Sequence, residues 1–215
     1  MNGTIIIGNK PYKKFKFNKI IDTFKECYRC NLSLPNQNNG TKKGKLALCS
    51  HMYERLVDQK VSLDSFIKFY QEEYSREEMV NFFNKFSLQA FEKVFFAASN
   101  QSNYNKWLSS HNCPYIFSEM PRTGYTVLFN LILSSKRDLY VSHFSINEEA
   151  QKSYATIGEP SACHNTTDEV NILRWLHSNS YVDASLCLLE DKASPTTATD
   201  NLKVSPSIKA LLNIK

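Results

Sequence analysis

Three side chains that lie far apart in the sequence could form a thiol-based catalytic site, namely Cys49, His143 and Asp183. A cysteine attacks as its thiolate, and the free N–H groups at the start of a helix lower the pKa of a thiol placed there. Cys49 stands where a loop enters a predicted helix over residues 47–58. His143 lies in the predicted strand Leu139–Ile146 and would act as the general base. Asp183, in the next predicted strand, would orient the imidazole.

This order and these placements resemble the papain-like thiol hydrolases and transferases, a class that includes many bacterial effectors and viral proteases. The resemblance covers the order of the elements and the three residues. It departs from that class at Leu46–Leu48, where a Gly or Asn usually precedes the cysteine, and the nearest upstream amides are at Gln37–Asn39. The resemblance implies a thiol-dependent hydrolase or transferase that acts on a protein substrate, with Cys49 as its nucleophile.

Two other sets place a histidine before the cysteine, which is the order of a second class of thiol enzymes. The cysteine of one set, Cys187, lies in the apolar run Ser185–Leu189, where a thiol usually behaves as a small hydrophobic side chain. These sets therefore fit catalysis less well. They are His143 with Glu159 and Cys187, and His111 with Glu119 and Cys163.

A zinc site is the competing interpretation of the first region. Cys27 and Cys30 form a Cys-x-x-Cys pair, and a Cys-x-His pair, Cys49 and His51, follows eighteen residues later. Zinc takes four such ligands in tetrahedral geometry. This set predicts a zinc-stabilised binding module without enzymatic activity. Because both interpretations use Cys49, at most one of them holds, and the catalytic one needs no cofactor.

Basic residues are concentrated at the N-terminus. Residues 1–45 hold ten Lys and Arg against Asp22 and Glu26, whereas the remainder holds 16 basic and 19 acidic residues. Aromatic and basic residues alternate along residues 11–19, a pattern that suits phosphate attraction with base stacking and also suits a half-buried strand. In the binding-module interpretation, residues 10–45 would contact nucleic acid or an acidic partner.

The remaining motifs exclude several enzyme classes. The sequence contains no phosphate-binding glycine loop, no His-Glu-x-x-His, no Gly-x-Ser-x-Gly elbow and no kinase signature. The N-terminal apolar run, Ile5–Ile7, is too short for a secretory signal, and no apolar run is long enough to span a membrane. We therefore expect reduced thiols in the cytoplasm of the producing cell or of a host cell.

The elements that must position these side chains follow from apolar spacing and turn residues. Helices are predicted to dominate from about residue 47 to about residue 99, and strands thereafter. This order favours an α+β fold, with a helical N-terminal half packed on a small, mainly antiparallel sheet formed by the C-terminal half. The predicted strands are Ile5–Ile7, Thr123–Leu133, Leu139–Ile146 and Tyr181–Leu189, and the predicted helices are 18–27, 47–58, 63–73, 75–95, 166–177 and 206–213.

Length and composition fit one domain. A chain of 215 residues with 42% hydrophobic and 22% charged residues can bury a core of its own. We expect a single α+β domain over residues 1–190, with the basic segment 1–45, and a loosely ordered tail over residues 191–215 that is rich in Ser, Thr, Pro and Asp. The abundance of Asn, Phe and Lys indicates an AT-rich genome, as in viruses or horizontally acquired bacterial genes.

Overall fold

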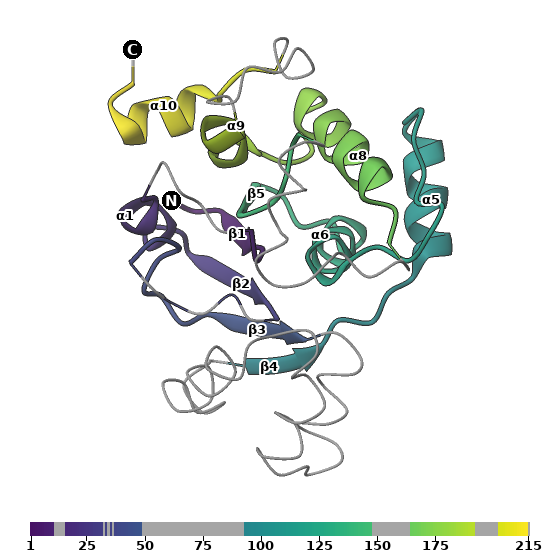
Figure 1. Ribbon diagram of the computed structural model, residues 1–215, viewed down its shortest axis with the longest axis horizontal. Helices are drawn as coiled ribbons and strands as arrows, with labels where there is room; N and C mark the ends of the chain where they lie inside the picture. Colours follow the sequence, from purple (N-terminus) through teal and green to yellow (C-terminus); the bar gives the residue numbers. More distant parts are fainter. Residues whose placement is uncertain are drawn as a thin grey trace.

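A five-stranded parallel sheet forms the centre of the molecule (Figure 1). The computed structural model describes residues 1–10, 16–31, 33, 35, 37–48, 93–147, 164–191 and 202–214. The strands are β1 (Thr4–Ile7), β2 (Glu26–Cys30), β3 (Lys45–Leu48), β4 (Lys93–Phe96) and β5 (Leu139–Ser142). Their order across the sheet is β4-β3-β2-β1-β5, and each neighbouring pair is parallel.

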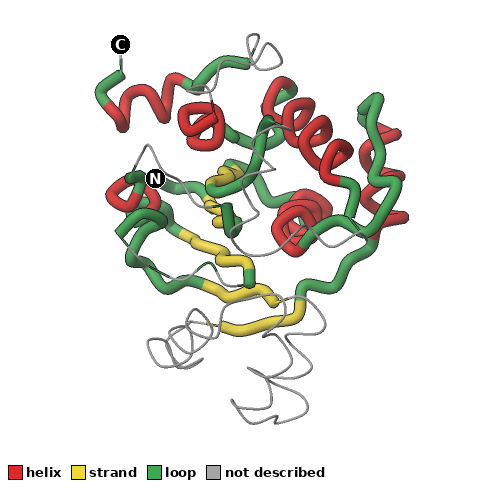
Figure 2. Tube along the Cα trace, in the orientation of Figure 1, coloured by secondary structure: helices red, strands yellow, loops and turns green. Residues whose placement is uncertain are grey.

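Helices cover both faces of this sheet, as Figure 2 shows with helices in red around the yellow strands. The described helices are α1 (Asn18–Ile21), α5 (Gln101–Ser110), α6 (Thr123–Leu133), α8 (Thr166–Ser178), α9 (Ser185–Asp191) and α10 (Pro206–Leu212). Helices α5, α6 and α8 share a core cluster with Ile6 and Cys30, whereas α1 and α10 share a second cluster with Ile5 and Ile7. None of these described helices is long and apolar enough to cross a membrane.

The inner strands are short apolar runs that are buried on both faces. Every residue of Ile5–Ile7 and of Leu46–Leu48 is fully buried. A strand in a parallel sheet is covered by helices on both sides, so it loses the alternation of apolar and polar residues that marks a half-exposed strand. The prediction of a strand at Ile5–Ile7 is confirmed by β1.

The two helices predicted near the C-terminus are also confirmed, as α8 and α10. The side chain of Asn165 accepts hydrogen bonds from the N–H groups of Thr167 and Asp168 at the start of α8. Ser205 accepts from the N–H of Ile208 in the same way, and Pro206 occupies the first turn of α10. These caps satisfy backbone donors that a helix start leaves free.

The predicted α+β fold with an antiparallel sheet is wrong. Strands β1 to β4 all precede residue 97, so the N-terminal half supplies most of the described sheet instead of a helical layer. Strand β5 lies within the predicted strand Leu139–Ile146, but it pairs with β1 in parallel. The architecture is a parallel α/β sheet between two layers of helices. Strands of four or five residues are too short to show a period, which is why the pattern failed here.

Two segments predicted as strands are helices. The segment Thr123–Leu133 is α6, whose residues Gly124–Phe129 are all buried, so its sequence shows no polar face and cannot be told from a buried strand. The predicted strand Tyr181–Leu189 contains the start of α9, and Asp183 Oδ1 accepts a hydrogen bond from Ser185 N at 2.9 Å there. A carboxylate in this position favours a helix start.

Much of the predicted helical half lies outside the described residues. This holds for the helix 63–73 and for most of the helices 47–58 and 75–95. Where the structure does describe these predictions, it places strands: β3 includes Ala47 and Leu48, and β4 includes Lys93–Phe96. The predicted helix 18–27 is divided between α1 and the first residues of β2.

The strand order changes direction at β1. Strands β2, β3 and β4 follow one another on one side of β1, and the chain then places β5 on its other side. Where the connections after two neighbouring parallel strands run to opposite sides of the sheet, a crevice forms beyond the carboxyl ends of those two strands. A ligand-binding site is therefore expected beyond the carboxyl ends of β1 and β5.

Candidate functional site

The loops that follow β1 and β5 are in direct contact at the carboxyl edge of the sheet. Gly8 N donates to Ser142 O at 2.9 Å, and Lys10 N donates to His143 O at 3.0 Å. A Cβ atom on Gly8 would lie 2.4 Å from His143 O, which no side chain tolerates. A glycine is therefore required where β1 ends.

The N-terminus of α6 meets the same edge. Asn31, which follows β2 with a left-handed φ of 49°, donates from Nδ2 to Thr123 Oγ1 at 3.1 Å. A Cβ atom on Gly124 would lie 2.7 Å from the ring of Phe144, so the first turn of α6 packs closely on the loop after β5. The residue before the helix, Arg122, makes no side-chain capping hydrogen bond. The N–H groups and dipole of an eleven-residue helix therefore face this edge, where they favour an anion. One carboxylate is already present there, since Glu169 Oε1 accepts from Arg122 N at 2.7 Å.

Three buried side-chain oxygens follow the carboxyl ends of β1, β2 and β5. They are Asn9 Oδ1, Ser33 Oγ and Ser145 Oγ, and none has a hydrogen-bond partner among the described residues. Ser145 is only 2% exposed. Since buried polar atoms in proteins nearly always have a partner, these three oxygens make this edge a candidate site for a polar ligand.

Two buried cations lie behind this edge. Arg29 of β2 is fully buried, and Lys10 is 3% exposed and paired with Asp191. Burial, together with the charges of Arg29 and Lys10, lowers the pKa of His143 to about 3, so this imidazole is neutral at physiological pH. The charge of Arg29 interacts with the Asp22 carboxylate, but its hydrogen bonds go to other groups. They run to the carbonyl oxygens of Ser33, Asn39, Gly40, Lys42 and Lys43 and to Asn39 Oδ1.

His164 is the described histidine best suited to proton transfer near this edge. It lies just before α8, is partly exposed, and its Nδ1 is 2.6 Å from Met120 O, three residues before α6 begins. A carbonyl oxygen can only accept, so Nδ1 carries the proton and the lone pair of the neutral ring is on Nε2. An imidazole held in this tautomer can act as a general base.

The other described histidines are placed less well. His143 is buried, and its Nδ1 is 2.6 Å from Ser142 Oγ. His177 uses both ring nitrogens, since Nδ1 accepts from Ala184 N at 3.1 Å and Nε2 bonds Lys203 O at 2.9 Å. His111 stacks on Trp107 at the end of α5, with 4.0 Å between ring centroids.

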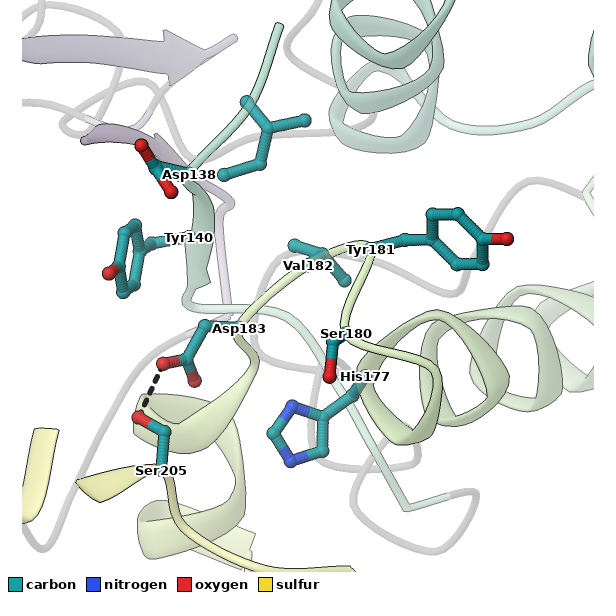
Figure 3. A pocket seen from close by; sticks show the side chains of 9 residues that line it. Asp138, Tyr140, His177, Ser180, Tyr181, Val182, Asp183 and Ser205 are labelled. Carbon is teal, nitrogen blue, oxygen red and sulfur yellow. Dashed lines mark hydrogen bonds between the residues drawn. The ribbon is translucent and has the colours of Figure 1, made fainter. Parts of the chain in front are cut away.

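A separate depression lies at the opposite, amino edge of the sheet (Figure 3). It has a volume of about 220 Å³ and is lined by Asp138, Tyr140, His177, Asp183 and Ser205 among others. Figure 3 shows the Asp183 carboxylate turned toward Ser205, whose hydroxyl donates to Asp183 Oδ2. The polar groups here therefore bond mainly to one another, in contrast to those beyond β1 and β5.

The structure does not bring together the predicted residues His143 and Asp183. Asp183 pairs alongside Tyr140 of β5, and His143 lies three residues further along, about 10 Å away at the usual strand rise. The carboxylate of Asp183 accepts from Ser185 and Ser205, so it does not orient the imidazole. The third predicted member, Cys49, lies outside the described residues.

The predicted zinc set is not assembled by its described members. Cys27 and Cys30 lie three residues apart on β2 and belong to the core clusters on opposite faces of the sheet, as the alternation of a strand requires. Burial, with a smaller effect from Cys27, raises the pKa of the Cys30 thiol. The other two members, Cys49 and His51, lie outside the described residues. Within the part of the chain that is described, no group of three or more His, Cys, Asp and Glu could hold a metal ion.

Four cations of the basic N-terminal segment are engaged in contacts within the fold. Of its ten Lys and Arg, Lys10 and Arg29 are buried with internal partners. Lys42 donates to Lys25 O at 2.9 Å, and Lys45 bonds Glu26 Oε1 at 3.4 Å. The prediction that residues 10–45 contact nucleic acid or an acidic partner is wrong as far as these four cations carry it, because each of them is engaged in contacts within the fold.

The fold is of the parallel α/β class, and two solved structures are similar to this chain along its whole length. One is the sialyltransferase CstII from Campylobacter jejuni in complex with a substrate analogue, CMP-3FNeuAc, with 13% identity, a TM-score of 0.48 and coverage of 100% of this chain and 99% of that one. The other is a variant of the sialyltransferase Cst-II in complex with CMP, with 14% identity, a TM-score of 0.47 and the same coverage. No family model and no curated protein matches the sequence.

The prediction of a thiol-dependent hydrolase or protease that acts on a protein substrate is wrong. Its base and its orienting carboxylate lie apart, with Asp183 committed to two serines. The candidate catalytic site is therefore the carboxyl edge of the sheet, in place of Cys49, His143 and Asp183.

Sequence reasoning missed the residues that gather at this edge. One signal was available: Gly8 and Asn9 directly follow the apolar run Ile5–Ile7, as expected where a buried strand ends at a ligand. Asn31, Ser145 and His164 carry no local pattern that separates them from other polar residues. Only the tertiary structure places Asn31 and His164 against the segment that leads into α6.

Proposed function

We propose that this chain binds a nucleotide beyond the carboxyl ends of β1 and β5 and transfers the group that the nucleotide carries. The observation that carries this proposal is the change of direction in strand order at β1. Open parallel sheets with helices on both faces bind their ligands at such a point. The polar oxygens without partners among the described residues are found at the same edge.

The phosphate of the nucleotide fits the N-terminus of α6. The first turn of this helix has no side-chain cap, and Gly124 keeps it close to the loop after β5. Free N–H groups at a helix start bind phosphate oxygens, and the helix dipole adds to the attraction.

The sugar hydroxyls and base of the nucleotide fit the two loops. Asn9 Oδ1 can accept a hydrogen bond, and Ser145 Oγ can donate or accept one. Both atoms are buried, so a ligand group that bonds them removes the free-energy penalty of an unpaired polar atom. This gives the site a preference for hydroxyl-bearing ligands over bare phosphate.

The transferred group in this proposal is a sugar, and His164 is the general base. The acceptor hydroxyl gives its proton to Nε2 of His164 while its oxygen forms a bond to the anomeric carbon of the sugar. The bond from that carbon to the phosphate oxygen breaks, and the nucleotide leaves with the electron pair. The N–H groups of α6 stabilise the charge on the leaving phosphate.

Calorimetric titration with CMP tests the proposal. CMP is the first ligand to test because both similar solved structures contain it, alone or joined to a sugar analogue. We expect saturable binding, and Ser145→Ala should weaken it by about tenfold, the loss of about 1.4 kcal/mol that one hydrogen bond supplies. Ser205→Ala at the opposite edge removes a comparable hydroxyl and should leave the affinity unchanged. Absence of binding by CMP and by other nucleotides would reject the proposal.

A further inference from the structure

A buried ion pair joins the two loops that enclose the candidate site. Lys10 Nζ donates to Asp191 Oδ1, and the two side chains are 4% and 2% exposed. The second oxygen, Asp191 Oδ2, accepts from Ile146 N at 3.0 Å. Lys10 N donates in turn to His143 O at 3.0 Å. One carboxylate at the end of α9 therefore fixes both the loop after β1 and the loop after β5.

The residues fixed in this way are direct neighbours of the buried oxygens at the site. Asn9 precedes Lys10, and Ser145 precedes Ile146. Each anchor is thus one peptide bond from a side chain whose oxygen has no partner among the described residues. A rotation of either anchored peptide would turn the neighbouring side chain away from the crevice.

We infer that the Lys10–Asp191 ion pair, which we term the loop clamp, positions Asn9 and Ser145 for the nucleotide. This inference rests on the proposed function and assigns Lys10 and Asp191 as positioning residues. A buried ion pair adds little net stability over an apolar pair of similar size, but it has a demanding geometry. The role of the clamp is therefore the exact placement of the two loops relative to each other.

The test separates the ion pair from the hydrogen bond to Ile146. The double variant Lys10→Met/Asp191→Asn removes both charges, and its amide oxygen can still accept from Ile146 N. It should melt near the wild-type temperature, whereas Lys10→Met alone leaves a buried unpaired carboxylate and should melt well below it. CMP affinity should fall about tenfold or more in the double variant, as it does when partners behind a binding residue are removed. The isosteric single variant Asp191→Asn leaves the buried ammonium of Lys10 unpaired and should also melt well below the wild type.

A matched control removes an ion pair from the amino edge. Lys136 Nζ is 2.7 Å from Glu26 Oε2, and the double variant Lys136→Met/Glu26→Gln should leave CMP affinity unchanged. Wild-type affinity in Lys10→Met/Asp191→Asn would overturn the clamp and leave the proposed function standing.

Failure of the wild type to bind CMP would reject the proposed function. The role of the loop clamp can still be tested in that case, by hydrogen exchange without a ligand. Hydrogen exchange at the amides of Lys10 and Ile146 in the ligand-free protein should be faster in the double variant, because the two loops separate more often. Unchanged exchange at both amides would overturn the clamp regardless of ligand.

Discussion

The two edges of the sheet differ in how their polar side chains are paired. At the amino edge, charged and polar side chains bond to one another; at the carboxyl edge, buried oxygens lack partners among the described residues and a helix start is uncapped. Both edges lie within one fold, so the difference reflects what each edge does. The amino edge holds the strands in register, and the carboxyl edge is the one that we propose binds a ligand.

Glu26 shows how the amino edge is closed. Its carboxylate at the start of β2 accepts from Thr4 Oγ1 at 3.0 Å, and lies 2.7 Å from Lys136 Nζ and 3.4 Å from Lys45 Nζ. These partners come from β1, from the turn before β5 and from β3. One side chain therefore connects three strands and the turn before β5.

The largest expected effect tests the chemistry assigned to the carboxyl edge. His164→Gln removes the general base and should lower the rate of CMP release from a CMP-linked sugar by about 10²- to 10⁴-fold. CMP affinity should stay at the wild-type value, because the base contacts the acceptor. His111→Gln is the matched control, since this imidazole stacks on Trp107 away from the site. Equal rates for the His164 variant and the wild type would remove His164 from the mechanism.

A smaller effect separates stability from binding at the two edges. Gly8→Ala places a methyl group 2.4 Å from His143 O and should lower the free energy of unfolding by about 1–3 kcal/mol and weaken CMP binding. Gly3→Ala, at the other end of β1, brings a methyl group 2.8 Å from Asp138 O and should destabilise the fold without changing CMP affinity. Urea unfolding and calorimetry measure the two quantities. An equal loss of CMP affinity in both variants would contradict the assignment of binding to the carboxyl edge alone.

The smallest effect concerns the pH dependence of the amino edge. Its hydrogen bond with Lys136 is the main reason that the pKa of Glu26 falls from 4.5 to about 2. A carboxyl group with a depressed pKa stabilises the fold above its unfolded pKa, and this stability is lost as pH falls from 4.5 toward 2. The difference in unfolding free energy between wild type and Glu26→Gln should therefore shrink across that window, from at most about 1 kcal/mol. Urea unfolding at several pH values measures it, and a constant difference would contradict the ion-pair role.

Local sequence signals predicted single elements better than their arrangement. The capped segments α8 and α10 and the apolar strand β1 carry their own start signals or uniform burial, and they were predicted correctly. Helix α6 was predicted as a strand because its first two turns are buried on all sides. Parallel pairing joins β1 to β5 across more than 130 residues, and no local pattern records such a contact.

The candidate site depends on that long-range pairing, which is why no local pattern in the sequence predicted it. Cysteines and histidines are rare and attract attention, whereas Asn9 and Ser145 are common residue types on ordinary loops. The prediction that His143 serves as a base overlooked its burial, which depends on loops from both β1 and β5. Asp183 was predicted to orient a histidine, but it lies beside the start of a helix that was predicted as a strand.

Arg29 has a consequence for how the loop after β2 is ordered. Its guanidinium gathers carbonyl oxygens around a positive charge, as a bound calcium ion does in other loops. This cation is covalently attached, so it cannot dissociate, and it keeps its proton across the physiological pH range. A lysine offers three donors from a single nitrogen and could not reproduce the planar arrangement. The carbonyl oxygens of Ser33, Asn39 and Gly40 are thus held around a cation that the chain itself supplies and that cannot exchange with solvent.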